Sequence, residues 1–277
     1  MKALFWVLGA IAFLFLLFLF LIMPRRRRKE AEPFMQVNYA HRGLWGEGVA
    51  ENSLTAFRLA AEAGYGIELD VQLSSDGEVV VFHDEGLLRV TGADASVYSS
   101  ELSFLRTLRL SGTNDTVPTL KEVLALVDGR VPLLVEIKSD HAWRTVCEKA
   151  AAILDGYTGA YCVESFHPLA VAWFRKNRER VVRGQLSSRL WREKRYRTLS
   201  HALVQNLLLN FYVRPDFIAY DYRDKGYFAL RLCRLWSPYT VAWTVKDKDA
   251  AKTLDDFDAL IFEGKDTVLE GKEKENA

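Results

Sequence analysis

Short apolar runs alternate with amphipathic segments along most of this chain. Eight apolar runs are expected to form strands, and they cover residues 37–41, 66–73, 131–138, 161–166, 181–186, 217–220, 240–245 and 259–262. Segments with apolar residues at helical spacing lie near residues 53–63, 119–127, 142–154, 169–178, 188–209, 225–235 and 248–254. This alternation is typical of a parallel sheet covered by helices.

Capping residues support several of these boundaries. Asn52 or Ser53 can begin the first helix of the predicted barrel and Gly64 can end it, while Thr119 followed by Glu122 fits a capping box. Eight strands in strict alternation favour a closed α/β barrel of the TIM (β/α)8 type over an open doubly wound sheet. The sequence contains no glycine-rich dinucleotide loop that would favour the open sheet.

The N-terminus carries one long uncharged segment. No charged residue occurs between Ala3 and Met23, and a helix of this length would extend ~31 Å, enough to cross the hydrocarbon core of a membrane. The alternative is a cleaved signal peptide, but its apolar part would be shorter and would end in small residues. Because this segment ends in Leu-Ile-Met-Pro, residues 1–24 are predicted to be an uncleaved transmembrane anchor.

A basic linker follows the predicted anchor. It covers residues 25–36 and begins with Arg-Arg-Arg-Arg-Lys, whereas only Lys2 and the α-amino group lie on the other side of the anchor. The positive-inside rule then predicts a single-pass membrane protein whose barrel domain, residues 37–270, lies in the cytoplasm. Residues 271–277 form a polar tail. The expected lipid partner is the bilayer around the N-terminal helix, and the basic cluster could also bind anionic head groups.

Composition excludes some partners. The 37 basic and 36 acidic residues give a formal net charge of +1, so no global field attracts nucleic acid. The three cysteines, Cys147, Cys162 and Cys233, show no metal-ligand spacing and are interpreted as reduced core thiols.

Two predicted strands carry charged residues at alternate positions. Glu68 and Asp70 alternate with Ile67, Leu69 and Val71, and a second strand alternates Glu136 and Lys138 with apolar residues. Side chains two positions apart on a strand share a face, so the charged set is expected to project into the barrel mouth while the apolar set packs outward. Three buried carboxylates would repel one another, and a divalent cation is the natural compensation.

A predicted hairpin brings a histidine to the same mouth. Asp76-Gly77 between alternating runs is a two-residue turn signal, and counting outward from it sets Asp70 opposite His83. His41 ends the first strand, which is the barrel neighbour of the strand that carries Glu68. Two imidazoles and three carboxylates at one end of neighbouring barrel strands favour a catalytic site over isolated structural residues.

These residues together resemble a known family. The motifs are Ala-His-Arg-Gly at 40–43, Glu-Asn-Ser-Leu-Thr-Ala-Phe at 51–57, Gly-Ile-Glu-Leu-Asp-Val at 66–71, Val-Val-Phe-His-Asp at 80–84, Pro-Thr-Leu-Lys-Glu-Val-Leu at 118–124, Glu-Ile-Lys at 136–138, Ser-Phe at 165–166 and Ala-Trp-Thr-Val at 242–245. Their order is similar to that of the glycerophosphodiester phosphodiesterase family, across nearly all of the chain after the linker. The resemblance implies a TIM barrel that hydrolyses glycerophosphodiesters to sn-glycerol 3-phosphate and an alcohol.

The resemblance also implies roles for particular residues. His41 and His83 would act as general acid and base, and Glu68, Asp70 and Glu136 would bind a divalent cation, Ca²⁺ or Mg²⁺. The implied phosphate ligands are Arg42 and Lys138. Trp243 could pack against the glycerol backbone or serve as a core aromatic.

Three positions depart from the family pattern. Lys246 stands where Asn is common, Phe-Glu-Gly at 262–264 replaces a common Thr-Asp, and Ala50 replaces a Pro. These departures leave the reaction unchanged but put substrate contacts at Lys246 and Glu263 in doubt.

Alternatives to the soluble diester substrate stay open at this point. A lysophospholipase D-like or other lipid-directed phosphodiesterase or lyase could use the same scaffold, and a non-catalytic membrane-tethered binding barrel is a third possibility. Residues 188–197 are basic with interleaved aromatics, and residues 203–213 are strongly apolar. This region fits either a segment that rests on the membrane surface or an amphipathic outer helix followed by a buried one. The sequence does not decide which histidine is the acid, or whether water or a substrate hydroxyl attacks.

Overall fold

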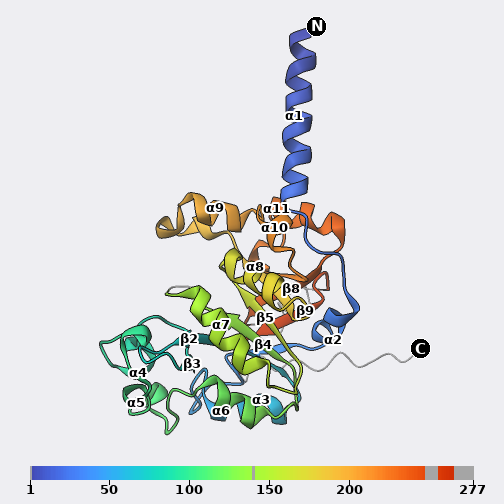
Figure 1. The fold of residues 1–277 in the computed structure, drawn as a ribbon. Coiled ribbons are helices and arrows are strands. Elements are labelled where there is room, and N and C mark those ends of the chain that lie inside the picture. Colours follow the sequence, from blue (N-terminus) through green and yellow to red (C-terminus); the bar gives the residue numbers. More distant parts are fainter. Residues whose placement is uncertain (1, 139–140, 247–254, 265–277) are drawn as a thin grey trace, which may run out of the picture.

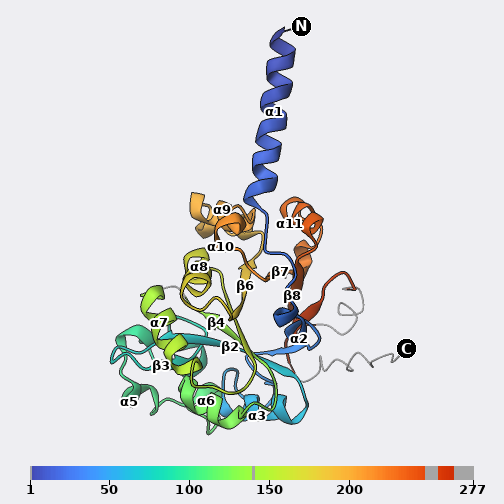
Figure 2. The same ribbon diagram turned by 45° about the vertical axis from the view of Figure 1, so that its right-hand side comes forward.

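Eight parallel strands close into the predicted TIM-type barrel in a computed structural model that describes residues 2–138, 141–246 and 255–264 (Figures 1 and 2). The strands are β1 (Tyr39–His41), β2 (Gly66–Leu73), β4 (Leu133–Ile137), β5 (Tyr161–Ser165), β6 (Val182–Ser187), β7 (Phe217–Asp221), β8 (Tyr239–Val245) and β9 (Ala259–Phe262). Each pairs in parallel with its neighbours, and the pairing of β1 with both β2 and β9 closes the barrel. A short strand, β3 (Val79–Val81), pairs antiparallel with the end of β2 as the predicted hairpin.

Helices follow the strands and cover the outside of the barrel (Figure 1). They are α3 (Leu54–Glu62), α6 (Leu120–Val127), α7 (Trp143–Leu154), α8 (Pro168–Asn177), α9 (Leu199–Gln205), α10 (Asn210–Val213) and α11 (Phe228–Cys233), with short α4 (Leu88–Thr91) and α5 (Leu102–Leu105) after the hairpin. Ser53 caps α3, and Thr119 forms the predicted capping box with Glu122 at α6. The predicted helix at 248–254 lies outside the described residues.

The single helix expected at 188–209 is wrong. Two 3₁₀ turns, Leu190–Arg192 and Lys194–Tyr196, come first. The helix α9 begins only at Leu199, and Thr198 caps it by accepting a hydrogen bond from the His201 amide. Residues 192–197 carry charges without apolar residues at helical spacing, so no apolar face holds them in a continuous helix. The helix prediction at 225–235 is confirmed in shortened form by α11, followed by a 3₁₀ turn at Arg234–Trp236.

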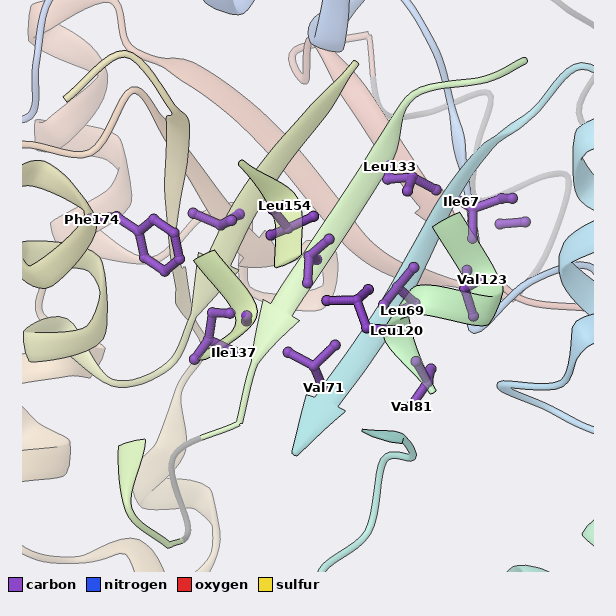
Figure 3. Close-up of a cluster of buried hydrophobic side chains, with 14 of the residues drawn as sticks. Ile67, Leu69, Val71, Val81, Leu120, Val123, Leu133, Ile137, Leu154 and Phe174 are labelled. Carbon is purple, nitrogen blue, oxygen red and sulfur yellow. The ribbon is translucent and has the colours of Figure 1, made fainter. Parts of the chain in front are cut away.

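The alternate side chains of β2 and β4 divide as predicted between the outer core and the barrel interior. Ile67, Leu69 and Val71 of β2 lie in one buried cluster with Leu120 and Val123 of α6 (Figure 3). Burial of such a side chain contributes roughly 1.5–3 kcal/mol to stability. The apolar face therefore fixes the register of β2 and turns its carboxylates toward the interior of the barrel.

A cluster of apolar side chains fills the end of the barrel where the strands begin. Tyr39, Phe217 and Tyr239 lie there in a second buried cluster, together with Phe34 and Met35 of α2 (Glu32–Met35). The Tyr39 hydroxyl donates to the Phe34 carbonyl at 2.9 Å. Because this end is filled, access to the barrel interior is left to the opposite end, where the strands finish.

The N-terminal helix α1 (Lys2–Leu21) stands clear of the barrel (Figures 1 and 2). It is long and apolar enough to cross a membrane, with a mean hydropathy of 2.9, and none of its residues is buried. Signal sequences near an N-terminus have the same length and apolar character.

The basic linker after α1 folds back onto the barrel. Arg28 makes two 2.8 Å hydrogen bonds to the buried carboxylate of Asp216, and Arg27 binds Asp258 at 2.8 Å. Arg25 also lies 3.9 Å from Asp216. These ion pairs tie the base of α1 to the barrel, so the helix and the barrel are firmly connected.

Candidate active site

The first site residues follow β1 in a tight turn. Arg42 and Gly43 both take left-handed backbone conformations, with φ of 58° and 82°. A side chain at Gly43 would lie 2.8 Å from the Cβ of Ala56, so only glycine fits between the turn and α3. The turn aims the Arg42 amide N–H at Glu68 Oε2, 2.9 Å away, and leaves the His41 ring beside the same carboxylate, with its Nε2 3.9 Å from Oε2.

Three buried carboxylates meet at the barrel mouth as predicted. The strand register places Glu68 beside His41 and Asp70 beside Glu136. One oxygen from each of Glu68, Asp70 and Glu136 lies within 4.8 Å of the others. The structure therefore brings together the acidic residues predicted from the sequence.

Burial and mutual repulsion perturb the proton affinities of these groups. Burial, followed by the charges of Asp70 and Glu136, raises the pKa of Glu68 well above its usual range. Burial also raises the pKa of Glu136. For Asp70, burial acts in the same direction, but Lys138 and the other nearby cationic groups outweigh it and hold the pKa well below its usual range.

Lys138 lies among the acids. Its Nζ is 2.9 Å from Asp70 Oδ1 and 3.0 Å from Glu136 Oε1. Burial lowers the pKa of Lys138, but these two carboxylates outweigh burial and raise it. One ammonium cannot neutralise three carboxylates, so part of the acidic charge stays uncompensated by Lys138. A set of three oxygen ligands with excess negative charge suits a hard divalent cation such as Ca²⁺ or Mg²⁺.

His83 reaches the mouth by a different route from the predicted one. The predicted register, Asp70 opposite His83, is wrong by one residue, because Val71 pairs with Val81 and Phe82 N donates to Asp70 O at 3.0 Å. The loop contains one residue more than the predicted Asp-Gly pair, and its closing bond runs from Ser74 N to Glu78 O.

A glutamine side chain bends the chain after β3. Nε2 of the buried Gln72 lies within hydrogen-bond distance of the carbonyl oxygens of Phe82, His83 and Asp84, at 2.8, 3.1 and 2.8 Å. Beyond Val81 the chain therefore leaves the ladder and curls around this amide. The curl brings the His83 ring to the cavity that His41 also lines.

A relay of ion pairs connects His83 to Arg42. His83 Nδ1 lies 2.6 Å from Asp84, and Asp84 accepts a 2.5 Å hydrogen bond from Arg89. Arg89 also donates to Glu51, which in turn accepts a 2.7 Å bond from Arg42. Burial would raise the pKa of Asp84, but its bonds with His83 and Arg89 hold it well below its usual range. The relay fixes the orientation of His83 and of the Arg42 guanidinium.

His41 is held by two of the residues that depart from the family pattern. Glu263 Oε2 lies 3.1 Å from His41 Nδ1, and Lys246 binds the other oxygen of Glu263 at 2.8 Å. Burial alone would raise the pKa of Glu263, but His41 and Lys246 lower it to about 2. The third departure, Ala50, is buried, and its carbonyl accepts a bond from Ser53. The two charged departures thus pair with each other and orient His41.

Another acid lies in the site that the motif analysis did not single out. Glu164 of β5 is paired in register with Glu136, is 2 % exposed and lines the same cavity. Among the described residues its Oε2 has no hydrogen-bond partner. Burial, with Glu136 and Asp70, raises its pKa well above the usual range. The signal was available, because Glu164 follows an apolar residue on β5 as Glu136 does on β4.

Several of these side chains line one space of about 90 Å³, which we call the catalytic cavity. Its walls include His41, Arg42, Glu68, His83, Glu136, Glu164, Phe166 and Trp243. Trp243 meets Phe166 edge to face with ring centroids 5.4 Å apart, and its buried indole N–H finds no hydrogen-bond partner within the part of the chain that is described. Trp243 is therefore a wall of the cavity rather than only a core aromatic.

Known structures share this fold. A phosphodiesterase from Oleispira antarctica, solved in complex with the product sn-glycerol-3-phosphate, superposes with a TM-score of 0.68 at 22% identity and covers 83% of this chain and 93% of that one. A glycerophosphodiester phosphodiesterase from Thermotoga maritima superposes with a TM-score of 0.65 at 28% identity and covers 82% of this chain and 93% of that one.

Sequence comparison identifies the family. A glycerophosphodiester phosphodiesterase from Caldanaerobacter subterraneus subsp. tengcongensis is 40% identical over 110 residues, which cover 36% of this chain and 44% of that relative. For five curated relatives, the match covers between 38% and 61% of the relative's length. The profile described as the glycerophosphoryl diester phosphodiesterase family matches residues 41–261. The chain therefore belongs to the glycerophosphoryl diester phosphodiesterase family.

Proposed function

We propose that this chain hydrolyses glycerophosphodiesters to sn-glycerol 3-phosphate and an alcohol. The observation that carries the proposal is the catalytic cavity, where His41, His83 and a cluster of buried carboxylates line one space. Family membership supports it, as does the sn-glycerol-3-phosphate in the Oleispira antarctica relative of the same fold.

The residues predicted from the sequence have proposed roles in or beside the cavity. Glu68, Asp70 and Glu136 would hold the cation, and when bound it would supply positive charge against the negative charge that grows on the phosphoryl oxygens. Arg42 and Lys138, which both lie beside the Asp70 carboxylate, would bind the phosphate, and the 2.7 Å bond from Arg42 to Glu51 holds the guanidinium in place. Trp243 would pack against the glycerol backbone.

The histidines divide the proton transfers. One imidazole takes a proton from the attacking hydroxyl or water, and the other donates a proton to the leaving alkoxide. Carboxylates at Nδ1 of both rings, Glu263 at His41 and Asp84 at His83, favour the tautomer with its proton on Nδ1. In the base, that tautomer leaves the Nε2 lone pair free to accept the proton. The acid is the cationic ring, which keeps its Nδ1 proton and donates a second proton from Nε2 to the alkoxide.

The test is the identity of the products. Full-length protein with Ca²⁺ or Mg²⁺ is expected to release choline and sn-glycerol 3-phosphate in equal amounts from glycerophosphocholine, measured by coupled assays for each product. Appearance of phosphocholine and glycerol would mean that the other ester bond breaks and would contradict the proposal. Absence of any product with either cation would favour the non-catalytic binding barrel.

We further propose that α1 is an uncleaved anchor over residues 1–24 and that the barrel lies in the cytoplasm. The basic linker at the C-terminal end of α1 supports this orientation. The protein is expected to stay in the membrane fraction after alkaline carbonate extraction, and protease added outside intact cells is expected to leave the barrel uncut. A barrel that is cleaved under those conditions would reverse the orientation.

A further inference from the structure

A second and larger cavity adjoins the catalytic cavity. It has a volume of about 680 Å³, and we call it the apolar groove after Leu169 of α8 and after Leu190, Leu203, Val204 and Leu209 from the segment around α9. Polar side chains complete its lining, namely Lys138, His167, Ser188, Glu193, Tyr196, Ser200 and His201. This volume is within the range of sites that hold small ligands. The segment that was wrongly predicted as one helix therefore forms the wall of a potential binding site.

The apolar groove is continuous with the catalytic cavity. Glu136, Phe166 and Trp243 line both spaces. A phosphodiester beside Glu136 could thus extend past the Phe166 and Trp243 rings into the groove. A small soluble diester such as glycerophosphocholine would leave these apolar walls uncovered, whereas a substrate with a hydrocarbon chain would bury them.

The groove also lies close to the base of α1. The helices α9, α10 and α11 surround that base (Figures 1 and 2). Asn210, the residue after the groove-lining Leu209, donates a 3.0 Å hydrogen bond to the Ile22 carbonyl at the end of α1. Phe211 packs on Phe20 of α1 with ring centroids 5.4 Å apart.

This contact sets the level of the groove relative to a bilayer. The 20 residues of α1 rise ~30 Å, which matches the hydrocarbon thickness of a membrane, so Phe20 would lie at its boundary. Phe228 of α11 packs on Phe18 with ring centroids 5.7 Å apart and is 59% exposed, and Leu199 of α9 is 77% exposed. Exposed apolar side chains at this level suit the membrane interface.

We propose that the apolar groove binds one hydrocarbon chain on the glycerol of the substrate, which makes the substrate a lysophospholipid drawn from the bilayer. The inference rests on the proposed function, because the phosphodiester must occupy the catalytic cavity. In the net reaction the phosphorus–oxygen bond to the head-group alcohol breaks. The hydroxyl of water then resides on phosphorus, and the proton of water goes to the leaving alkoxide.

The experiment compares substrates that release the same product. Full-length protein in lipid nanodiscs is assayed for choline release from glycerophosphocholine and from monomeric lysophosphatidylcholines with chains of up to eight carbons. The kcat/KM is expected to rise at least about tenfold from the chain-free substrate to the eight-carbon one, because each buried methylene contributes to binding. Equal kcat/KM values across the series would overturn the inference.

Two matched substitutions on α9 test where the hydrocarbon chain of the substrate binds. Leu203→Trp fills the groove and is expected to lower kcat/KM for the eight-carbon substrate at least about tenfold, with the value for glycerophosphocholine changing less than about twofold. Leu199→Trp places the same side chain on the exposed side of α9 and should leave both values unchanged. A lower kcat/KM for the eight-carbon substrate in Leu199→Trp, or an unchanged value in Leu203→Trp, would contradict the placement of the hydrocarbon chain in the apolar groove.

The unmodified protein keeps the inference testable if Leu203→Trp fails to fold, since the chain-length series needs no variant. Failure of the proposed function is distinguishable as well. In that case neither glycerophosphocholine nor any lysophosphatidylcholine would yield choline, whereas failure of the groove alone leaves glycerophosphocholine turnover intact and chain length without effect.

Discussion

Replacing either His41 or His83 with alanine is expected to lower kcat for glycerophosphodiester hydrolysis by at least about 10². Both rings line the catalytic cavity, and each is fixed by a carboxylate at Nδ1, Glu263 or Asp84. Without one imidazole, either the nucleophile loses its base or the alkoxide leaves without a proton. The measurement is steady-state choline release from glycerophosphocholine by each variant at saturating divalent cation.

A histidine outside the catalytic cavity provides a matched control for these substitutions. His141 is exposed, binds Glu85 at 2.9 Å and does not line the catalytic cavity, so His141→Ala should keep full activity. Glu263→Ala is expected to lower kcat by roughly 10- to 100-fold with little change in KM, because Glu263 holds the His41 ring and does not itself line the catalytic cavity. Glu263→Gln should recover part of that loss. Full activity in both His41→Ala and His83→Ala would refute their assignment.

The barrel could be predicted from the sequence because its strands obey a simple alternation. On β2, Ile67, Leu69 and Val71 pack against the helices. The alternate residues Glu68 and Asp70 therefore point into the barrel interior. A shift of one residue would bury both charges under α6, at a cost too large to be tolerated. The three carboxylates of the site were predictable for the same reason, because alternate residues on neighbouring barrel strands face the same interior.

The route of His83 to the site could not be predicted from local pairing rules. The Asp-Gly signal gave a two-residue turn, but the Ser74 hydroxyl binds Asp76 at 2.5 Å and accepts from Glu78 N, which stabilises a longer loop. The shifted register would turn His83 away if β3 continued. Instead the Gln72 side chain binds three carbonyl oxygens beyond Val81, and strand and turn propensities do not predict such a side-chain-to-backbone interaction.

Residues that act through long-range partners were missed for a similar reason. Glu263 was recognised only as a departure from the family pattern. It lies 222 positions from His41, and although the predicted closed barrel sets β9 beside β1, no local motif indicates that this carboxylate reaches the His41 ring. The segment at 188–209 was expected to be helical throughout, but its charged residues 192–197 interrupt the helix, and Leu190, Leu203, Val204 and Leu209 line the apolar groove. Such residues pack against a cavity, and a cavity has no periodicity in sequence.

Removal of the divalent cation by a chelator is expected to abolish turnover, and Glu68→Gln is expected to weaken cation binding at least about tenfold. The physical reason is the excess negative charge at Glu68, Asp70 and Glu136, whose ligand atoms lie within 4.8 Å of one another. Titration calorimetry with Ca²⁺ and with Mg²⁺ measures the affinity independently of activity. Glu62→Gln, which removes an exposed carboxylate paired with Arg58, serves as the matched control and should bind cation normally.

Replacement of Lys138 is expected to change cation binding and turnover in opposite directions. Its Nζ lies between Asp70 and Glu136, at 2.9 and 3.0 Å, so it competes electrostatically with a cation at those carboxylates. Lys138→Met should therefore tighten cation binding by about tenfold or more, since a neighbouring like charge is removed. Turnover should nevertheless fall, because the phosphate loses a positive partner. Weaker cation binding in Lys138→Met, or unchanged binding in Glu68→Gln, would mean that these carboxylates do not hold the ion.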